Sequence, residues 1–284
     1  MQVQDRVIEG VSVPAFLYGT AWKEEKTERL TALALRAGFR GIDTANQRKH
    51  YHEAAVGAAV SEAIRSGSVT RKELFLQTKF TFRDGQDHRL PYDPNAPVAI
   101  QVEESFAKSL EHLAVESIDS YVLHGPSRRD GLSSADWEAW HAMESIRDSG
   151  RASLLGVSNV SADQLAALCK GARIKPSFVQ NRCYAERGWD RDIRRFCKAN
   201  GLVYQGFSLL TANGDALGHP TLLRIAERHG RTPAQIVFRF ALDAGMITLT
   251  GTTDLGHMRA DLGVLDFSLD PDEVTRIESL DAAR

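Results

Sequence analysis

The sequence predicts an α/β protein, a (β/α)8 or TIM barrel that spans residues 1–284 as a single domain and ends in a short C-terminal helix. Short apolar runs rich in β-branched residues alternate with longer segments of helical period, and eight such pairs follow one another. No hydrophilic linker or change of composition divides the chain. The turn after the first run, LYGTAWKEE, has no glycine-rich phosphate motif, which argues against an open doubly wound sheet.

The predicted strands are short runs of apolar residues bounded by polar residues or glycine. In chain order they are Ala15–Tyr18, Gly41–Asp43, Leu74–Thr78, Ser120–Leu123, Ser153–Val157, Phe178–Gln180, Leu202–Gln205 and Met246–Thr250. Because helical segments separate these runs, neighbouring strands cannot be joined by hairpins and must run parallel to one another.

The predicted helices are segments in which apolar residues recur every three or four positions. They are Thr27–Ala37, His52–Arg65, Ala99–Leu113, Ser134–Asp148, Ser161–Lys170, Asp190–Asn200, Thr232–Ala244 and one polar helix within Ser268–Arg284. Ser161 and Thr232 are expected N-caps, because their hydroxyl oxygens can accept a free N–H of the first turn. Pro233 suits a first helical position, and Gly201 suits a helix end.

The composition is that of an ordinary globular protein. Lys and Arg total 35 against 37 Asp and Glu, so the net charge of −2 argues against a nucleic-acid partner or an anionic membrane surface. No apolar run reaches the roughly 18 residues of a membrane span, and the N-terminus lacks a signal-peptide apolar segment. Cys169, Cys183 and Cys197 form no CxxC pair, so we expect no disulfide, no metal site and a cytoplasmic location. Nothing in the sequence indicates the oligomeric state.

Polar residues stand where three consecutive predicted strands end. Asp43 ends the second strand, Lys79 follows the third and His124 follows the fourth, while Tyr51 lies in the loop after Asp43. Each alone has a structural explanation, such as a turn cap or a packed aromatic ring. In a barrel, however, the carboxyl ends of all strands meet at one opening, so these four side chains are expected to lie together.

These four residue types suit one kind of chemistry. A tyrosine has a pKa near 10, and a nearby ammonium group lowers that pKa by favouring the phenolate. An aspartate beside the lysine keeps the lysine charged, and a histidine can orient a carbonyl oxygen. The set predicts a general acid that protonates an oxygen on which negative charge develops. Such an acid is needed when hydride is delivered to a carbonyl carbon.

The motifs, taken in order, resemble those of the aldo-keto reductases. They are GFRGIDTA, HYHEAAVG, LFLQTKF, SLEHLAVESIDSYVLHGP, LLGVSN, FVQN and RTPAQIVFRFAL, and they extend from about Gly19 to Leu262. The resemblance implies a (β/α)8 barrel that reduces aldehydes and ketones with NADPH, without a metal. A small-molecule carbonyl compound is the implied substrate.

The resemblance also implies roles for single residues. Tyr51 would be the general acid, Lys79 and Asp43 would tune its pKa, and His124 would orient the carbonyl group. Three residues would hold the nicotinamide carboxamide, namely Ser158, Asn159 and Gln180. Phe207 would stack on the nicotinamide ring, and Ser208, Leu209 and Leu210 would continue along the pyrophosphate. Trp22 would form one wall of the substrate pocket.

Two departures from the family pattern bear on these roles. The loop between Asp43 and Tyr51 is longer than usual, so that His50 aligns with the family's tyrosine when the following helix is used as reference. We predict Tyr51 as the acid because a phenol paired with Lys79 is chemically required. His50 is the alternative donor or part of the substrate pocket.

The second departure lies after the last strand, in TGTTDLGHMRADL. Gly251, Thr252, His257 and Asp261 stand where the family usually carries the lysine, serine, arginine and asparagine of an NADP site. A 2′-phosphate favours Arg or Lys. NADP(H) therefore follows from the resemblance, while NAD(H) stays open.

Two other functions fit part of this pattern. A Schiff-base aldolase could use Lys79 as nucleophile, but it leaves Ser158, Asn159, Gln180 and Phe207 without a task. A cofactor-binding module that senses redox state would have no use for the Asp43, Tyr51, Lys79 and His124 set.

Overall fold

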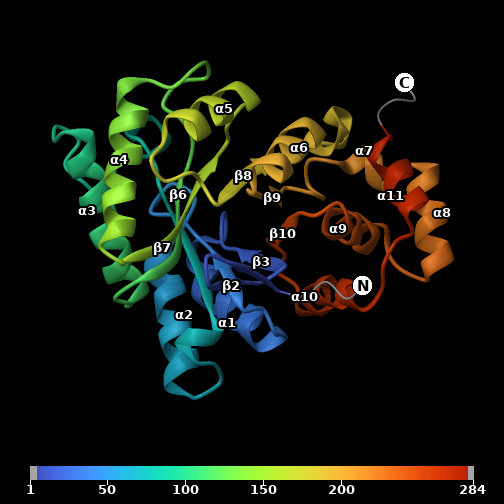
Figure 1. The fold of residues 1–284 in the computed structure, drawn as a ribbon. Helices are drawn as coiled ribbons and strands as arrows, with labels where there is room; N and C mark the ends of the chain where they lie inside the picture. The colour runs from blue at the N-terminus through green and yellow to red at the C-terminus, as the bar shows by residue number, and fades with distance from the viewer. Residues whose placement is uncertain (1–4, 281–284) are drawn as a thin grey trace.

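The computed structural model describes residues 5–280 and confirms the predicted barrel (Figure 1). Eight parallel strands close on themselves in the order β10-β3-β4-β5-β6-β7-β8-β9, and the helices lie around their outside. The strands are β3 (Phe16–Gly19), β4 (Gly41–Asp43), β5 (Phe75–Phe80), β6 (Ile118–Leu123), β7 (Ala152–Ser158), β8 (Phe178–Arg182), β9 (Val203–Phe207) and β10 (Ile247–Thr250).

All eight predicted strands are present, and most differ only at their ends. The third predicted strand ended at Thr78, but β5 continues because Lys79 pairs with Val122 and Phe80 with Leu123. The sixth and seventh predicted strands also extend beyond their predicted ends, because Arg182 of β8 pairs with Phe207 of β9. Pairing between strands, which a single run of sequence does not display, decides these ends.

Seven predicted helical segments are present, as α1 to α6 and α9, with ends shifted by at most one residue. The described residues form eleven α-helices. They are α1 (Thr27–Ala37), α2 (Glu53–Arg65), α3 (Val98–Leu113), α4 (Ser134–Asp148), α5 (Ala162–Gly171), α6 (Arg191–Asn200), α7 (Gly214–Leu217), α8 (Pro220–His229), α9 (Pro233–Asp243), α10 (Leu255–Leu262) and α11 (Pro271–Glu278). Ser161 and Thr232 cap α5 and α9 as predicted, each accepting a backbone N–H at 3.2 Å. Gly201 ends α6 with φ 74°.

Three features were not predicted. The N-terminal segment forms an antiparallel hairpin of β1 (Arg6–Ile8) and β2 (Val11–Val13), whose turn residues Glu9 and Gly10 have φ values of 48° and 84°. An alternating apolar pattern around a glycine was the available signal. Helices α7 and α8, which precede α9, and α10, which follows β10, also lie outside the predicted segments. The predicted C-terminal helix is shorter than expected, and residues 281–284 lie outside the described range.

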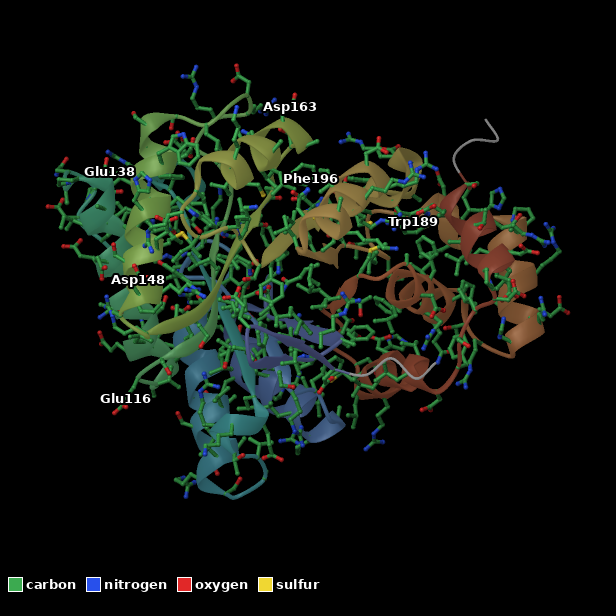
Figure 2. The ribbon with its side chains drawn as sticks, in the orientation of Figure 1. Glu116, Glu138, Asp148, Asp163, Trp189 and Phe196 are labelled. Carbon is green, nitrogen blue, oxygen red and sulfur yellow. The ribbon has the colours of Figure 1, made fainter. Side chains whose placement is uncertain are left out.

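Apolar and polar residues divide the interior of the barrel into two layers. Its base is a cluster of buried side chains that includes Val13, Leu17, Phe75, Leu154, Phe178, Ile247 and Leu249, with Ile8 and Val11 of the hairpin packed against it. A larger core lies between the strands and the helices (Figure 2). Trp189 belongs to this core and donates from Nε1 to the carbonyl of Ile277 at 2.9 Å, which ties α11 to the barrel. The base leaves only the carboxyl end of the barrel for polar chemistry.

Three buried cysteines are free thiols. Burial raises the pKa of Cys183 and of Cys197 to about 12, and it also raises the pKa of Cys169. Within residues 5–280, no helix carries an apolar stretch long enough to cross a membrane. The same residues contain no group of three or more His, Cys, Asp and Glu side chains arranged to hold a metal ion.

Gly57 allows α2 to approach the end of α3 closely. A Cβ at this position would lie 1.9 Å from the backbone oxygen of His112. We expect Gly57→Ala to lower the free energy of unfolding by about 1–3 kcal/mol, because the helices must separate to admit the methyl group. Denaturant titration measures this change. Gly214→Ala is the matched control, since a Cβ there meets no atom within 4 Å; equal effects of the two substitutions would contradict the packing.

Candidate active site

The carboxyl ends of the strands surround one cavity of about 1410 Å³. Gly19, Asp43, Ser158, Phe207 and Thr250 line it at the ends of five different strands. Every side chain predicted for the site lines this cavity except that of Lys79, which lies behind Asp43. The lining residues among those predicted are Trp22, Asp43, His50, Tyr51, His124, Ser158, Asn159, Gln180, Phe207, Ser208, Leu210, Gly251, Thr252, His257 and Asp261. The barrel topology therefore brings the predicted residues together.

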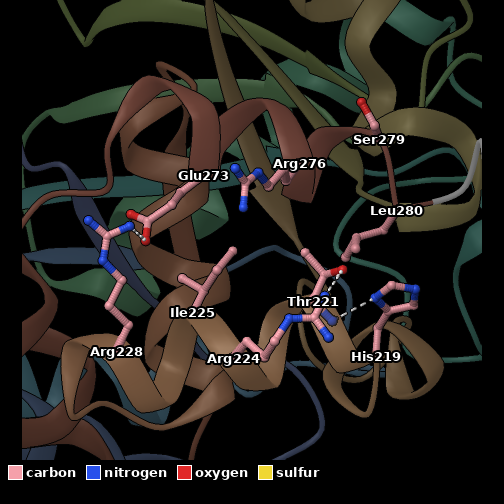
Figure 3. Close-up of a pocket in the computed structure, with 9 residues that line it drawn as sticks. All are labelled: His219, Thr221, Arg224, Ile225, Arg228, Glu273, Arg276, Ser279 and Leu280. Carbon is pink, nitrogen blue, oxygen red and sulfur yellow. Dashed lines mark hydrogen bonds and ion pairs between the residues drawn. The ribbon is translucent and has the colours of Figure 1, made fainter.

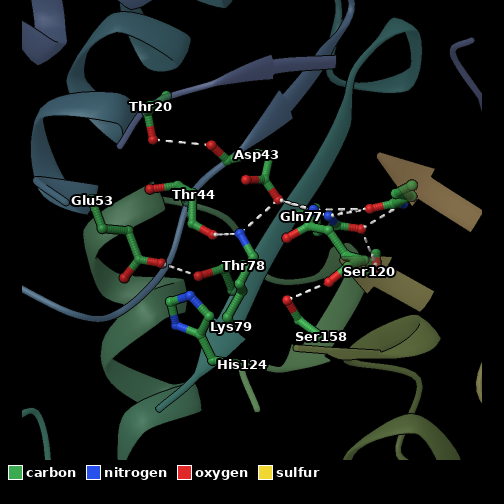
Figure 4. A network of polar contacts seen from close by, with 12 residues as sticks. Thr20, Asp43, Thr44, Glu53, Gln77, Thr78, Lys79, Ser120, His124 and Ser158 are labelled. Carbon is green, nitrogen blue, oxygen red and sulfur yellow. Dashed lines mark hydrogen bonds and ion pairs between the residues drawn. The ribbon is translucent and has the colours of Figure 1, made fainter. Parts of the chain in front are cut away.

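A buried ion pair forms the floor of the cavity at one side (Figure 4). Lys79 Nζ donates to Asp43 Oδ1 at 2.7 Å and to the carbonyl of Thr44 at 2.8 Å, and only 1% of the Lys79 side chain is exposed. Burial lowers the pKa of Lys79, and the Asp43 carboxylate offsets part of that effect. With its ammonium held by two acceptors away from the cavity, Lys79 is poorly placed to attack a substrate, which argues against an aldolase.

Tyr51 lies above this pair. Its ring centroid is 5.3 Å from Lys79 Nζ and 5.9 Å from the ring of His124, which it meets edge-on. The predicted lowering of its pKa is wrong: burial raises the pKa of Tyr51 well above its usual range, and the Asp43 carboxylate raises it further. The expected effect of Lys79 is outweighed because Asp43 balances its charge. The phenol is consequently fully protonated near neutral pH.

His124 presents a neutral imidazole to the cavity. Burial, followed by the charge of Lys79, lowers its pKa to about 3. Nδ1 lies 2.7 Å from the hydroxyl of Thr81. With that hydroxyl as donor, the ring proton resides on Nε2, which can then donate to an oxygen atom in the cavity.

The three residues predicted to hold a carboxamide, Ser158, Asn159 and Gln180, are each fixed by hydrogen bonds within the barrel. Ser158 Oγ donates to the carbonyl of Gln180 at 2.6 Å, and Asn159 Nδ2 donates to the carbonyl of His124 at 2.8 Å. Asn159 has a φ of 52°, a left-handed conformation that asparagine adopts readily. These bonds hold hydroxyl and amide groups at the edge of the cavity.

The aromatic residues of the opening lie on two sides. Trp22 is 70% exposed and stacks on His50 with ring centroids 3.8 Å apart, and its backbone N–H donates to the carbonyl of His50 at 2.7 Å. On the other side, the Arg182 guanidinium lies 5.7 Å from the ring centroid of Phe207. His50 thus contributes to the wall, whereas Tyr51 contacts the Lys79 and His124 groups.

The end of the cavity that follows β10 holds Gly251, Thr252, His257 and Asp261, together with a residue that was not predicted. Lys23 lines this end, and its Nζ donates to the carbonyl of Gly251 at 2.7 Å. Burial lowers the pKa of Lys23 to about 8, and burial raises the pKa of Asp261 to about 6. The signal for Lys23 was its position directly after Trp22 in the loop that follows the first strand.

A second, smaller cavity of about 390 Å³ lies between α8 and α11 (Figure 3). Arg224, Arg228 and Arg276 are among its lining residues, and Glu273 is bonded to Arg228 at 3.1 Å and to His229 at 2.9 Å. None of the predicted site residues lines it. The large cavity is therefore the candidate active site.

Comparison with known proteins gives one consistent result. The model of the Aldo/keto reductase family matches residues 17–282. The uncharacterized oxidoreductase YtbE of Bacillus subtilis is 30% identical over 282 residues, covering 99% of this chain and 93% of that protein. Glyoxal reductase of the same organism is 30% identical over 275 residues, covering 95% and 90%.

Solved structures agree. A Bombyx mori aldo-keto reductase in complex with NADP superposes with a TM-score of 0.82 at 25% identity, covering 99% of this chain and 94% of the other. An aldo/keto reductase from Brucella melitensis gives a TM-score of 0.81 at 26% identity, covering 98% and 100%.

The state of His124 can be tested by NMR of protein labelled with ¹⁵N in its histidine rings, with His124→Gln to assign the signal. Because the pKa of His124 is about 3, its ring signals are expected to stay constant between pH 5 and pH 8 and to match the neutral form. A titration midpoint near pH 6.5, the ordinary value for histidine, would show that the ring is not shielded as the structure indicates.

Proposed function

The chain belongs to the aldo/keto reductase family and is an NAD(P)H-dependent oxidoreductase, and from this premise we propose that it reduces an aldehyde or ketone to the alcohol with NADP(H), with Tyr51 as the proton donor. One observation carries the proposal. A protonated phenol and a neutral imidazole face the same cavity, next to a buried ion pair and to the polar edge formed by Ser158, Asn159 and Gln180.

The lining residues fit a nicotinamide dinucleotide. At one end, hydroxyl and amide groups offer the donors and acceptors that a carboxamide requires, and Phe207 offers an aromatic face beside them. Lys23, in the loop after β3, and His257, in α10 after β10, offer N–H groups that can donate to phosphate. A nicotinamide cofactor held there would supply the hydride for a carbonyl carbon.

Tyr51 and His124 would act on the carbonyl oxygen. The Nε2–H of His124 donates to that oxygen and orients it, while Thr81 fixes the ring from the other side. As negative charge develops on the oxygen, Tyr51 gives it a proton. A raised pKa does not prevent this step, because an alkoxide is a stronger base than a phenolate and because the acid must be protonated beforehand.

Lys79 would favour the phenolate that Tyr51 becomes. The Lys79 ammonium, 5.3 Å from the ring centroid, lies in a buried region where its attraction for a negative charge is stronger than in water. Asp43 favours the charged form of Lys79 and holds its ammonium in place. The Asp43 carboxylate itself raises the pKa of Tyr51, so Lys79 would offset only part of the cost of proton donation.

Small aldehydes and dicarbonyls are the substrate class to test first, since one relative of 30% identity is named glyoxal reductase. Phe82 and Asp84, in the loop after β5, line the cavity and would contact such a substrate.

Replacing the proposed acid tests the mechanism. Tyr51→Phe is expected to lower kcat for aldehyde reduction by about 100- to 10,000-fold, the usual contribution of a general acid, while the Kd for NADP⁺ stays near that of the unmodified protein. His50→Gln is the control and is expected to retain most of the activity. If His50→Gln removes the activity and Tyr51→Phe does not, His50 is the acid. NADPH oxidation and cofactor titration are the measurements.

The residues after β10 are proposed to set the cofactor preference. We expect kcat/KM to be higher with NADPH than with NADH, and His257→Gln to lower the value for NADPH by about 10-fold, as loss of one hydrogen bond would. The value for NADH should change little, since it lacks the 2′-phosphate. A strong preference of the unmodified protein for NADH would contradict the NADP(H) assignment.

A further inference from the structure

Three glutamines form a buried layer inside the barrel, and one of them, Gln180, lines the cavity. Gln77 comes from β5, Gln180 from β8 and Gln205 from β9; Gln77 and Gln205 are fully buried, and Gln180 is almost so. Figure 4 shows Gln77 beside Asp43. The layer just below them in the barrel is apolar. Packing alone would continue that apolar layer upward, because burying an amide has a cost unless the amide is fully hydrogen-bonded.

The three amides bond to one another and to Asp43. Gln77 Nε2 donates to Asp43 Oδ1 at 2.7 Å and to Gln205 Oε1 at 2.8 Å, and Gln205 Nε2 donates back to Gln77 Oε1 at 3.1 Å. Gln180 Nε2 donates to Asp43 Oδ1 at 3.0 Å and to Gln205 Oε1 at 2.9 Å. Gln77 Oε1 also accepts from Ser120 at 2.9 Å.

This pattern leaves each amide a single orientation. The Asp43 carboxylate can only accept, so Gln77 and Gln180 must both turn Nε2 toward it. Gln77 then offers its second N–H to Gln205, whose Oε1 must face it. Turning Gln180 around would place its oxygen against two acceptors, Asp43 Oδ1 and Gln205 Oε1. Both N–H groups of Gln180 are therefore used inside the barrel, which leaves Oε1 as the polar atom that it presents to the cavity.

We propose that Gln77 and Gln205 are positioning residues that lock Gln180 with its oxygen toward the cofactor, so that the site selects a nicotinamide-ring substituent that donates an N–H. The inference rests on the proposed function, because it needs a nicotinamide cofactor in the cavity. A carboxamide carries the required N–H donors, whereas a methyl ketone at the same ring position has none. Gln180 then recognises this substituent through a hydrogen bond, and Gln77 and Gln205 determine which atom of Gln180 is available for that bond.

A purely structural role makes a different prediction. If the layer only fills the barrel, then replacing a glutamine there changes stability and weakens all cofactors equally. If it orients Gln180, the ratio of two affinities changes. The probes are NADP⁺ and its 3-acetylpyridine analogue, in which the methyl ketone replaces the carboxamide. Kd values for both are obtained by calorimetry or from quenching of tryptophan fluorescence, without turnover.

Gln205→Leu removes the acceptor that Gln205 gives to Gln180, and Gln77→Leu removes the partner that orients Gln205. The unmodified protein is expected to bind NADP⁺ more tightly than the analogue, and each variant is expected to reduce that ratio by about 2- to 10-fold, the range for one hydrogen bond. Gln180→Leu removes the proposed acceptor itself and is expected to give the largest decrease in this affinity ratio. Gln205→Met, which keeps the side-chain length, replaces Gln205→Leu if the latter does not fold.

Gln101→Leu is the matched control. Gln101 is a buried glutamine of α3 that donates to the carbonyl of Ala96 at 2.8 Å and does not line the cavity, so its loss should leave the ratio unchanged.

The outcomes separate two kinds of failure. If the unmodified protein binds neither NADP⁺ nor the analogue, the proposed function is wrong. If it binds both and the ratio in Gln205→Leu and Gln77→Leu equals that of the unmodified protein, the positioning role is overturned while the proposed function stands. A ratio that falls equally in Gln101→Leu would also overturn it.

Discussion

The site depends on one charge pair placed where water does not reach. Lys79 and Asp43 lie on adjacent strands, are almost fully buried and meet at 2.7 Å. A buried carboxylate is tolerated only when its oxygens are well supplied with donors. Asp43 Oδ1 therefore also attracts the amides of Gln77 and Gln180, and through them Gln205. A single ion pair thus determines the polarity of the upper barrel, the surroundings of Tyr51 and the groups that face the cofactor end of the cavity.

The barrel and the grouping of the site residues were predictable because the order of strands and helices determines which residues lie at the same opening. Once strands alternate with helices, their carboxyl ends must meet; Asp43 and Ser158 stand at such ends, and His124 directly follows β6. The hairpin β1–β2 was missed because its strands are three residues long and lie outside the repeating pattern. Gln77, Gln205 and Ser120 were missed for a different reason. They lie within strands, on β5, β9 and β6, and only the closed barrel makes them neighbours.

The sign of the Tyr51 pKa shift was beyond sequence reasoning as well. The residues indicate that a lysine and an aspartate are both nearby, but the outcome depends on which of them faces the phenol and on how much water is excluded. Here burial dominates and Asp43 balances Lys79. The division between Tyr51 and His50 is likewise decided by contacts: the ring of Tyr51 lies beside Lys79 and His124, whereas the ring of His50 lies on Trp22.

The burial of the three cysteines has a consequence for the proposed reduction of aldehydes or ketones. Aldehydes are electrophiles, and the thiolate is the cysteine form that attacks them. Because burial raises the pKa of Cys183 and of Cys197 to about 12, both remain thiols at pH 7. Their enclosure in the core also limits the approach of an electrophile. The fold thereby protects these sulfur atoms from adduct formation by an aldehyde.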